Sequence, residues 1–304
     1  MHLLVTGSNG FIGRNFCAWC HEHYGWEITG LDLSESSRIP VEHYVQYSLG
    51  PAGSIDALDD AMSGVDAVVH FAADMRREPH NVAVVRDNCT GTQMLLEACE
   101  RAGVSCFVQL SSLPVIGHPV EHPIDEHHPL KPPTVYHATK VMDELLANYA
   151  DYARGIRGVS LRICAPVGEG VKPTTIFPTF VRNALDGKDI VLYGKGTRKQ
   201  TFIHAYDIAQ AICKAITSEN AHGVYNLASR NLISNMELAE KCIEILGSSS
   251  QIVYNGQPDP SDDEVWDVCI DRLEKDTGYE PKLSIDECIR RQAAYLAGEE
   301  NASK

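Results

Sequence analysis

A tyrosine and a lysine four positions apart, Tyr136 and Lys140, are the residues best placed for chemistry in this chain. They lie in a segment with helical periodicity, so both side chains share one face about one turn apart. A lysine ammonium near a phenol stabilises the phenolate and lowers its pKa from about 10, which suits the tyrosine for acid-base work. Ser112 ends an earlier apolar strand, where its hydroxyl could bond a reacting oxygen. A tyrosine-lysine pair of this spacing is common by chance on helices, and it becomes specific here because a glycine-rich loop and a strand-end serine precede it in the chain.

A glycine-rich loop near residue 10 supplies the second half of such a site. An apolar strand runs into Gly7, Gly10 and Gly13, and a helix follows. Gly7 permits the turn off the strand, Gly10 lets backbone approach a pyrophosphate, and Gly13 lets the helix pack closely. Asp32 ends the next apolar strand, where a carboxylate binds ribose hydroxyls and repels a 2′-phosphate. The loop and Asp32 together predict NAD rather than NADP as the cofactor.

The elements that must position these residues alternate between apolar strands and amphipathic helices. This alternation predicts an α/β fold, a doubly wound parallel sheet of the Rossmann type with the ligand crevice at the carboxyl ends of its strands. We expect strands at 3–6, 27–31, 67–71, 106–110 and 159–163, and helices at 13–23, 55–62, 88–101, 136–152, 177–185, 205–216, 235–246 and 285–297.

The pattern loosens after residue 163, which indicates a second, smaller unit. We predict a dinucleotide-binding domain of residues 1–165, to which residues 201–228 return. Residues 166–200 and 229–304 would form an interrupted lobe that binds substrate over the crevice.

Charge and hydropathy exclude several partners. The 304 residues carry a formal net charge of −15, which disfavours binding to nucleic acid or to an anionic membrane surface, since both are polyanions. No apolar run reaches the length of a membrane span, and no basic stretch precedes an apolar run near residue 1. We therefore expect no nucleic acid and no membrane as partners, and a cytoplasmic location.

Two groups of cysteine and histidine residues could in principle bind a metal or haem. Cys17, Cys20 and His21 form the C-x-x-C-H pattern of haem attachment, but they fall on the helix after the glycine loop and lack a second cysteine pair. We predict that these cysteines pack as small apolar residues. Four histidines lie in a proline-broken stretch, which predicts a solvated loop rather than a metal site. They are His118, His122, His127 and His128.

Together these motifs resemble the extended short-chain dehydrogenase/reductase family, in its NAD-dependent epimerase/dehydratase group. The similarity extends over nearly the whole chain and includes 70–73, 88–92, 202–204 and 278–279. It implies that Tyr136 exchanges a proton with the carbinol, that Lys140 also holds the nicotinamide ribose, and that Ser112 orients the substrate oxygen. It further implies an NAD site lined by Gly7, Asn9, Gly10, Phe11, Ile12, Gly13, Asp32, Leu33, Leu49, Phe71, Ala72, Ala73, Asn88, Tyr136 and Lys140.

The chain also departs from the pattern of this family. Members that dehydrate sugar nucleotides usually carry an Asp-Glu pair after the active-site hydroxyl, and Leu113 and Pro114 stand there. Ala165 and Gln200 replace an Asn and an Arg typical of sugar-nucleotide enzymes, and the acidic run 258–263 replaces a second Arg. Bidentate arginines bind a diphosphate, whereas carboxylates repel it. The substitute candidates for substrate binding are Arg76, Arg77, Arg198 and Lys199, together with Gln200 itself.

Three functions follow from these residues. The first is a sugar-nucleotide epimerase that works by transient oxidation to a ketone. The second is an NAD-dependent dehydrogenase or reductase for a smaller sugar, sugar acid or hydroxy-ketone without a diphosphate. A non-catalytic NAD-binding protein would have no need of Tyr136, Lys140 and Ser112. Two helices of this family commonly pair into a dimer interface, which predicts a homodimer through 88–101 and 136–152.

Overall fold

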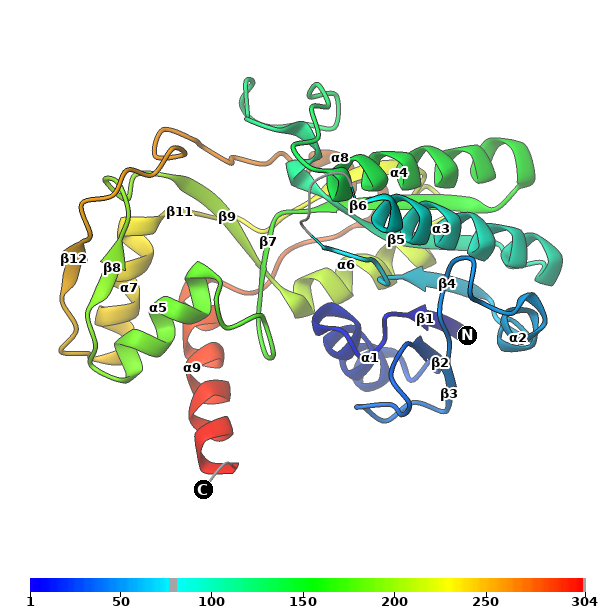
Figure 1. Ribbon diagram of the computed structural model, residues 1–304, viewed down its shortest axis with the longest axis horizontal. Helices are drawn as coiled ribbons and strands as arrows, with labels where there is room; N and C mark the ends of the chain where they lie inside the picture. The colour runs from blue at the N-terminus through cyan, green and yellow to red at the C-terminus, as the bar shows by residue number, and fades with distance from the viewer. Residues whose placement is uncertain (77–80, 303–304) are drawn as a thin grey trace.

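The computed structural model describes residues 1–76 and 81–302. A seven-stranded sheet forms the larger part of the molecule (Figure 1), and all its neighbouring strands pair in parallel. From one edge to the other the strands are β10 (Gly223–Leu227), β6 (Arg157–Ile163), β5 (Cys106–Ser112), β4 (Ala67–His70), β1 (His2–Thr6), β2 (Glu27–Asp32) and β3 (His43–Gln46). The predicted Rossmann-type sheet is therefore confirmed, and β10 and β3 are strands that the sequence pattern did not predict.

Helices cover both faces of this sheet. Residues alternate between the faces, so Leu3 and Val5 join one core cluster while Leu4 joins the other. One face is covered by α1 (Phe11–Tyr24) and α6 (Ala205–Thr217), and the other by α2 (Ile55–Ala61), α3 (Val82–Ala102) and α4 (Val135–Arg154). Cys17 and Cys20 lie fully buried on α1, which confirms their predicted packing role.

A smaller lobe stands beside the seven-stranded sheet (Figure 1) and has its own apolar core. Its strands form a three-stranded sheet and a two-stranded sheet. The first contains β7 (Ala165–Val167), β9 (Lys199–His204) and β11 (Asn231–Ser234), and the second contains β8 (Ile190–Leu192) and β12 (Ile252–Tyr254). The helices are α5 (Ile176–Leu185), α7 (Asn235–Leu246) and α9 (Ile285–Ala302), while α8 (Asp271–Thr277) packs on β10 and α6.

One local prediction is wrong, and another fails only at His128, since His118, His122 and His127 are exposed as predicted. Helix α3 begins at Val82 rather than Asn88, because the Asn81 side chain caps it by accepting a hydrogen bond from the Ala83 amide. Val82 and Val85 are exposed although Val84 is fully buried, so apolar residues on both sides of the first turn obscure the helical period. In the histidine-rich stretch, His128 is buried rather than solvated, because its ring accepts from the Val120 amide and contacts the Pro129 carbonyl.

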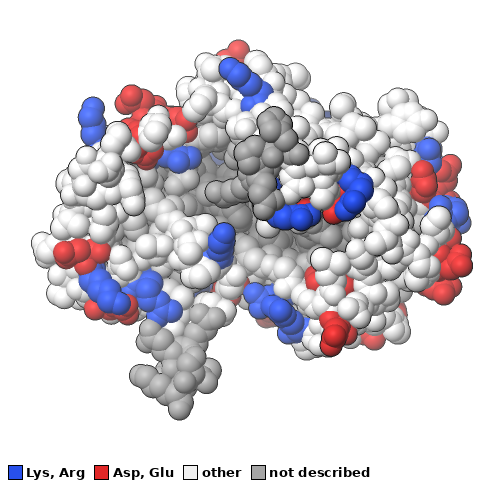
Figure 2. Space-filling model, viewed as in Figure 1, with Lys and Arg blue, Asp and Glu red and all other residues white. Residues whose placement is uncertain are grey.

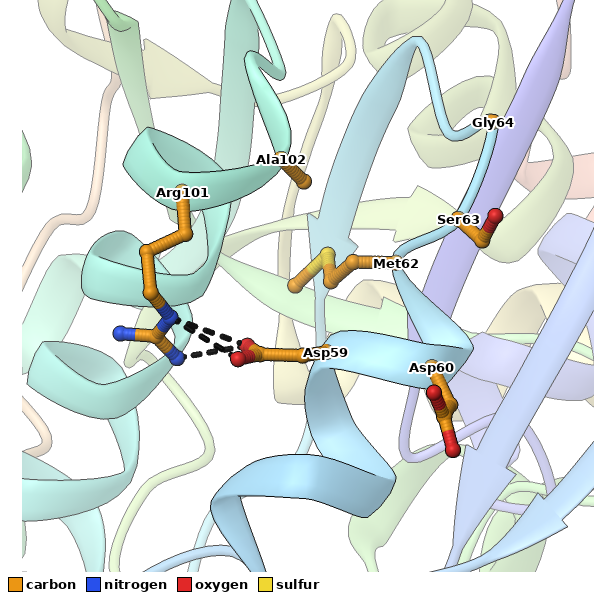
Figure 3. A pocket seen from close by; sticks show the side chains of 7 residues that line it. All are labelled: Asp59, Asp60, Met62, Ser63, Gly64, Arg101 and Ala102. Carbon is orange, nitrogen blue, oxygen red and sulfur yellow. Dashed lines mark hydrogen bonds and ion pairs between the residues drawn. The ribbon is translucent and has the colours of Figure 1, made fainter.

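None of the helices in residues 1–76 and 81–302 combines the length and hydropathy that crossing a bilayer requires. A shallow hollow lined by Asp59, Arg101 and their neighbours (Figure 3) lies where the chain enters β4 and β5, at the amino ends of the strands. It therefore lies at the opposite ends of the strands from the crevice that binds ligands in such folds.

Candidate active site

The glycine loop between β1 and α1 has a shape that only glycine allows. Gly7 has a φ of +67°, and a Cβ there would stand 2.8 Å from the Ala72 amide nitrogen. A Cβ on Gly13 would stand 2.2 Å from the Gly7 carbonyl oxygen, so the first turn of α1 packs directly on the loop. Gly10 is the N-cap of α1 and provides no side chain to bond the free amides of the first turn. This open helix end and bare loop fit a dinucleotide pyrophosphate.

Asp32, the last residue of β2, stands beside this loop. Its Oδ2 accepts a hydrogen bond from the Asn9 amide at 3.1 Å, and its Oδ1 accepts from the Ser34 amide at 3.2 Å. The Asn9 side chain in turn donates to the Ser36 carbonyl and accepts from the Arg38 amide. The carboxylate is thus held at the strand end, where it suits ribose hydroxyls and disfavours a 2′-phosphate.

The segment after β4 forms the opposite wall of the loop. The Ala72 amide donates to Thr6 Oγ1 at 3.2 Å, and the Phe71 ring packs edge-on against Phe16 with centroids 5.4 Å apart. The backbone of Phe71 and Ala72 therefore lies against Gly7, which would bring residues 71–73 to the same bound nucleotide. Leu33 is 70% exposed just beyond Asp32, and Leu49 packs beside Gly91 of α3.

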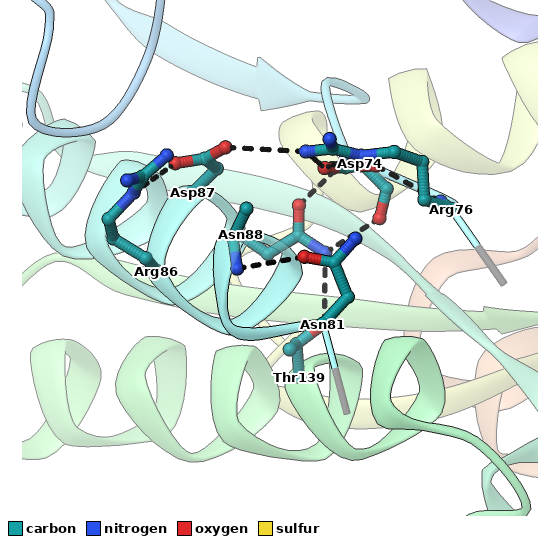
Figure 4. Close-up of polar contacts among 8 residues, drawn as sticks. Asp74, Arg76, Asn81, Arg86, Asp87, Asn88 and Thr139 are labelled. Carbon is teal, nitrogen blue, oxygen red and sulfur yellow. Dashed lines mark hydrogen bonds and ion pairs between the residues drawn. The ribbon is translucent and has the colours of Figure 1, made fainter. Parts of the chain in front are cut away.

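Asn88 on α3 fastens the chain that follows this wall (Figure 4). Its Oδ1 accepts from the Asp74 amide at 2.7 Å, and its Nδ2 donates to the Asp74 carbonyl and to Thr139 Oγ1, both at 3.0 Å. Every one of these contacts joins α3 to the 72–76 segment or to α4. The Asn88 side chain therefore joins α3 to the neighbouring segment and to α4 in this structure, and its predicted contact with NAD stays a prediction.

Tyr136 lies in the first turn of α4, at the carboxyl end of the sheet. Thr134 caps the helix by accepting from the His137 amide, which fixes the start of the turn that carries the tyrosine. Lys140 Nζ lies 6.0 Å from the centre of the Tyr136 ring. The Lys140 side chain is only 3% exposed and lies beside the phenol.

Ser112 ends β5 and leads into a short 3₁₀ helix, η1 (Leu113–Ile116), against which α4 packs. The Ser112 hydroxyl makes no capping hydrogen bond to η1 and remains available. Leu113 is fully buried, and Pro114 follows it in the first turn of η1. The structure thus brings Ser112, Tyr136 and Lys140 to one end of the sheet, as predicted, with no carboxylate directly after the serine.

A buried polar layer beneath this site was not recognised from the sequence. Glu144 on α4 forms a bidentate ion pair with Arg162 on β6, and Glu144 Oε1 also accepts from the Ser111 hydroxyl at 2.5 Å. His70 contacts Thr6 Oγ1 at 2.7 Å through Nδ1. Burial and the nearby Lys140 charge lower the pKa of His70 from 6.5 to about 3, so the ring is neutral at physiological pH. The signal available in the sequence was a charged residue on the inward face of a helix and another near the end of an apolar strand.

The candidate substrate residues lie in different settings. Arg76 pairs with Asp74 and approaches Asp87 at 3.8 Å, whereas Arg77 falls outside the described residues. Arg198 Nε lies 3.9 Å from Glu264 Oε2, and Gln200 donates to Asn235 at a long 3.4 Å. Figure 2 shows a hollow between the lobes with Lys and Arg side chains around its rim. In residues 1–76 and 81–302, no group of three or more His, Cys, Asp or Glu could hold a metal ion.

The acidic run after Pro258 is folded onto the smaller lobe. Both Asp262 carboxylate oxygens accept hydrogen bonds from backbone amides, one from Lys195 at 2.7 Å and one from Gly196 at 3.1 Å. Glu264 instead accepts from Trp266 Nε1 at 3.0 Å and contacts His118, which follows η1. One of the carboxylates expected to repel a diphosphate, that of Asp262, therefore accepts hydrogen bonds from the loop between β8 and β9.

The parallel sheet and the glycine loop together are those of an NAD-binding α/β enzyme. The sequence profile of the NAD-dependent epimerase/dehydratase family matches residues 3–228. The chain belongs to this family and uses NAD as its cofactor.

Individual relatives cover the whole chain. A dTDP-glucose 4,6-dehydratase of Streptomyces niveus is 30% identical over 299 residues, which is 93% of this chain and 89% of that protein. The low-salt glycan biosynthesis protein Agl12 of Haloferax volcanii is 27% identical and is covered completely, over 99% of this chain.

Solved structures of the same architecture superpose closely. A UDP-glucose 4-epimerase of Thermotoga maritima, solved with UDP-glucose, is 22% identical, with a TM-score of 0.86 over 99% of this chain and all of that one. DesIV, a dTDP-glucose 4,6-dehydratase from Streptomyces venezuelae with NAD and TYD bound, is 25% identical, with a TM-score of 0.82 over 99% of this chain and 98% of that one.

Proposed function

We propose that this protein epimerises a secondary hydroxyl of a sugar nucleotide through a transient ketone, without eliminating water. The observation that carries the proposal is the pair Leu113 and Pro114 after Ser112. A dehydratase needs a second acid and base to remove water after the first oxidation. A buried leucine and a proline have no ionisable group, whereas inversion at one carbon requires only the groups that exchange a proton and a hydride.

The residues of the chain divide this work among them. The Tyr136 phenolate accepts the proton of the substrate hydroxyl, and Lys140 stabilises the phenolate by its charge. Ser112 donates a hydrogen bond to the substrate oxygen and holds it while the carbon becomes planar. NAD, when bound, supplies the acceptor and later the donor of the hydride. Tyr136 then returns its proton to the oxygen after the sugar has presented its other face.

Asp32 and the glycine loop support retention of a dinucleotide throughout this cycle. The loop would bind the pyrophosphate through backbone amides, and Asp32 would bind the ribose of the adenosine. Lys140 would also reach the nicotinamide ribose because it lies beside the phenol that contacts the reacting carbon. An epimerase benefits from such a cradle because the same cofactor molecule must both take and return the hydride.

A second candidate is an NAD-dependent dehydrogenase for a smaller sugar or sugar acid. It is favoured by Gln200, which stands at the position where sugar-nucleotide enzymes carry an arginine that binds the diphosphate. The Gln200 amide is uncharged and donates to Asn235. The contacts of Asp262 with the 195–196 backbone weaken this argument, because that carboxylate is already committed to the loop. The basic rim of the hollow in Figure 2 further supports an anionic substrate, and we therefore rank the epimerase first.

A substrate panel separates the two candidates. UDP- and dTDP-hexoses, the corresponding free sugars and their uronic acids are incubated with the enzyme, with and without added NAD. The epimerase produces a stereoisomer of equal mass, visible by NMR, with no steady growth of the NADH absorbance. Stoichiometric NADH from a free sugar would overturn it in favour of the dehydrogenase, and loss of 18 mass units would overturn it in favour of a dehydratase.

We also propose that two copies of the chain pair through α3 and α4. Exposed apolar side chains recur at helical spacing along α4, namely Met142, Leu145, Tyr149 and Tyr152. Leu145 is 59% exposed and Tyr152 is 79% exposed, and Val82 and Val85 are exposed on the neighbouring α3. Exposed apolar side chains on two packed helices suit a self-complementary four-helix contact with a second copy.

A further inference from the structure

Asp143 on α4 is a buried carboxylate that the chemistry described above does not use. It lies seven positions after Tyr136 and three after Lys140, so the three residues lie along one stripe of the helix. Asp143 is 1% exposed, and within the described parts of the chain neither of its carboxylate oxygens has a hydrogen bond of good geometry, although the Thr92 hydroxyl lies near them. Lys140 Nζ lies 3.6 Å from its Oδ2.

The groups around Asp143 leave Lys140 as its counter-charge. On α4, Glu144 is already paired with Arg162, and it adds a second negative charge close by. On the facing α3, Thr92 and Cys89 approach, and both are uncharged at neutral pH because burial raises the pKa of the Cys89 thiol to about 11. On β4, His70 is neutral. Burial raises the pKa of Asp143, and the Lys140 charge opposes this effect.

We propose that Asp143 is a positioning residue for the reaction, which holds the Lys140 ammonium and sets the net charge that Tyr136 experiences. This inference rests on the proposed function of Tyr136 as the acid and base. A lysine with a carboxylate beside it presents a dipole to the phenol rather than a full positive charge. The ion pair therefore moderates the stabilisation of the phenolate, so that Tyr136 can both accept and return a proton near neutral pH.

Energetics argue against a merely structural role for this carboxylate. A buried acid without hydrogen bonds costs free energy of folding, and an apolar side chain of similar size is often more stable at such a position. Its single close charge contact is the lysine that acts on the tyrosine. The cost is explained if the carboxylate directs Lys140 along the stripe toward Tyr136 and offsets part of its charge there.

The first test reads Tyr136 directly and needs neither substrate nor NAD. The protein is labelled with ¹³Cζ-tyrosine, and Tyr136→Phe identifies the resonance by its loss. Asp143→Asn keeps the shape and removes the charge, so the phenol sees an uncompensated ammonium. The pH midpoint of the Tyr136 titration should fall by about half to one unit, as expected for one charge about 10 Å away in a partly screened site. Asp151→Asn, on the same helix but paired with the half-exposed His222, is the matched control and should leave the midpoint unchanged.

The second test asks whether the effect passes through the lysine. In a Lys140→Met background, Asp143→Asn should move the midpoint by less than about 0.2 units, because the unpaired carboxylate is then protonated by burial. An equal shift with and without Lys140 would contradict the positioning role. Asp143→Leu replaces Asp143→Asn in both tests if the latter fails to fold in a thermal melt.

The third test connects the ion pair to turnover on whichever substrate is active. Asp143→Asn should move the acid limb of the kcat profile to lower pH by the same amount, with KM changed less than threefold. A tyrosine midpoint that stays within about 0.2 units of wild type overturns the inference even if the enzyme epimerises sugars. A shifted midpoint in a protein that proves to be a dehydrogenase retains the inference and rejects the epimerase.

Discussion

Glu144 and Arg162 form a bidentate ion pair between α4 and β6, with both side chains only 4% exposed. The pair connects the helix that carries Tyr136 and Lys140 to the strand beside β5, whose end carries Ser112. Because Glu144 also accepts from the Ser111 hydroxyl, it holds the helix and the strand that carry the proposed catalytic residues relative to each other.

Removal of this ion pair gives the first prediction. Glu144→Gln leaves the Arg162 guanidinium buried without its counter-charge, so the free energy of unfolding should fall by about 3–5 kcal/mol in urea titrations. Asp59→Asn is the control, because Asp59 makes a bidentate pair with Arg101 on the surface (Figure 3), where the loss should stay below about 1 kcal/mol. Equal losses for the two variants would contradict the assigned role of the buried pair.

The glycine loop gives the second prediction. Gly13→Ala places a methyl group 2.2 Å from the Gly7 carbonyl oxygen, so the loop must move away from the helix. Affinity for NAD, measured by calorimetry, should fall more than tenfold, since the amides that would hold the pyrophosphate are displaced. Gly298→Ala is a helical glycine with nothing within 4 Å of the new methyl group, and it should leave NAD affinity unchanged. An unchanged affinity in Gly13→Ala would exclude this loop as the dinucleotide cradle.

Glu169 gives a prediction for the pH dependence of stability. Burial favours a higher pKa for its carboxyl, but His204 at 3.3 Å and Arg291 at 3.0 Å outweigh burial, so the pKa falls from 4.5 to about 2. A carboxyl whose pKa is lowered by folding stabilises the fold at every pH above its pKa in the unfolded chain. This contribution disappears as the pH falls from about 4.5 to about 2.

Glu169→Gln should therefore be less stable than wild type at pH 7, by about 1–2 kcal/mol because water screens part of the charge. The two proteins should converge in denaturant titrations near pH 2. A difference that stays constant from pH 7 to pH 2 would show that the ionised form contributes nothing.

The apolar stripe on α4 predicts the oligomeric state. Leu145→Asp adds a charge to the centre of the proposed contact, so light scattering after gel filtration should report a dimer for wild type and a monomer for the variant. Val191→Asp, at an exposed valine of the smaller lobe, should remain dimeric. A monomeric wild type at micromolar concentration would refute the pairing.

Local patterns explain which parts of the fold were predictable. Helix α7 has the predicted bounds because Ser234 and Glu237 form a capping box at its start. The five central strands were recognised because their apolar runs are buried on both faces. The strands of the smaller lobe escaped detection because β7, β8 and β12 have three residues each, too few to show a period.

The site was predictable where function depends on local spacing. Gly7, Gly13, Tyr136 and Lys140 lie as their spacing in the chain requires. The spacing of Asp143 from Lys140 is local, but its burial depends on which residues of α3 cover it across the helix pair. Burial of this kind arises from tertiary packing, and the charged residue type alone gave no signal for it.

The role of Tyr136 as acid and base is tested most directly by Tyr136→Phe. This variant removes one hydroxyl and leaves the ring and Lys140 in place, with Tyr149→Phe on the exposed face of α4 as the control. The measurement is the turnover of the active substrate together with the dissociation constant for NAD. Turnover should fall by about 10²–10⁴ with NAD affinity within threefold of wild type, because proton transfer is lost and the cofactor cradle is intact. Turnover equal to that of the control would contradict the account.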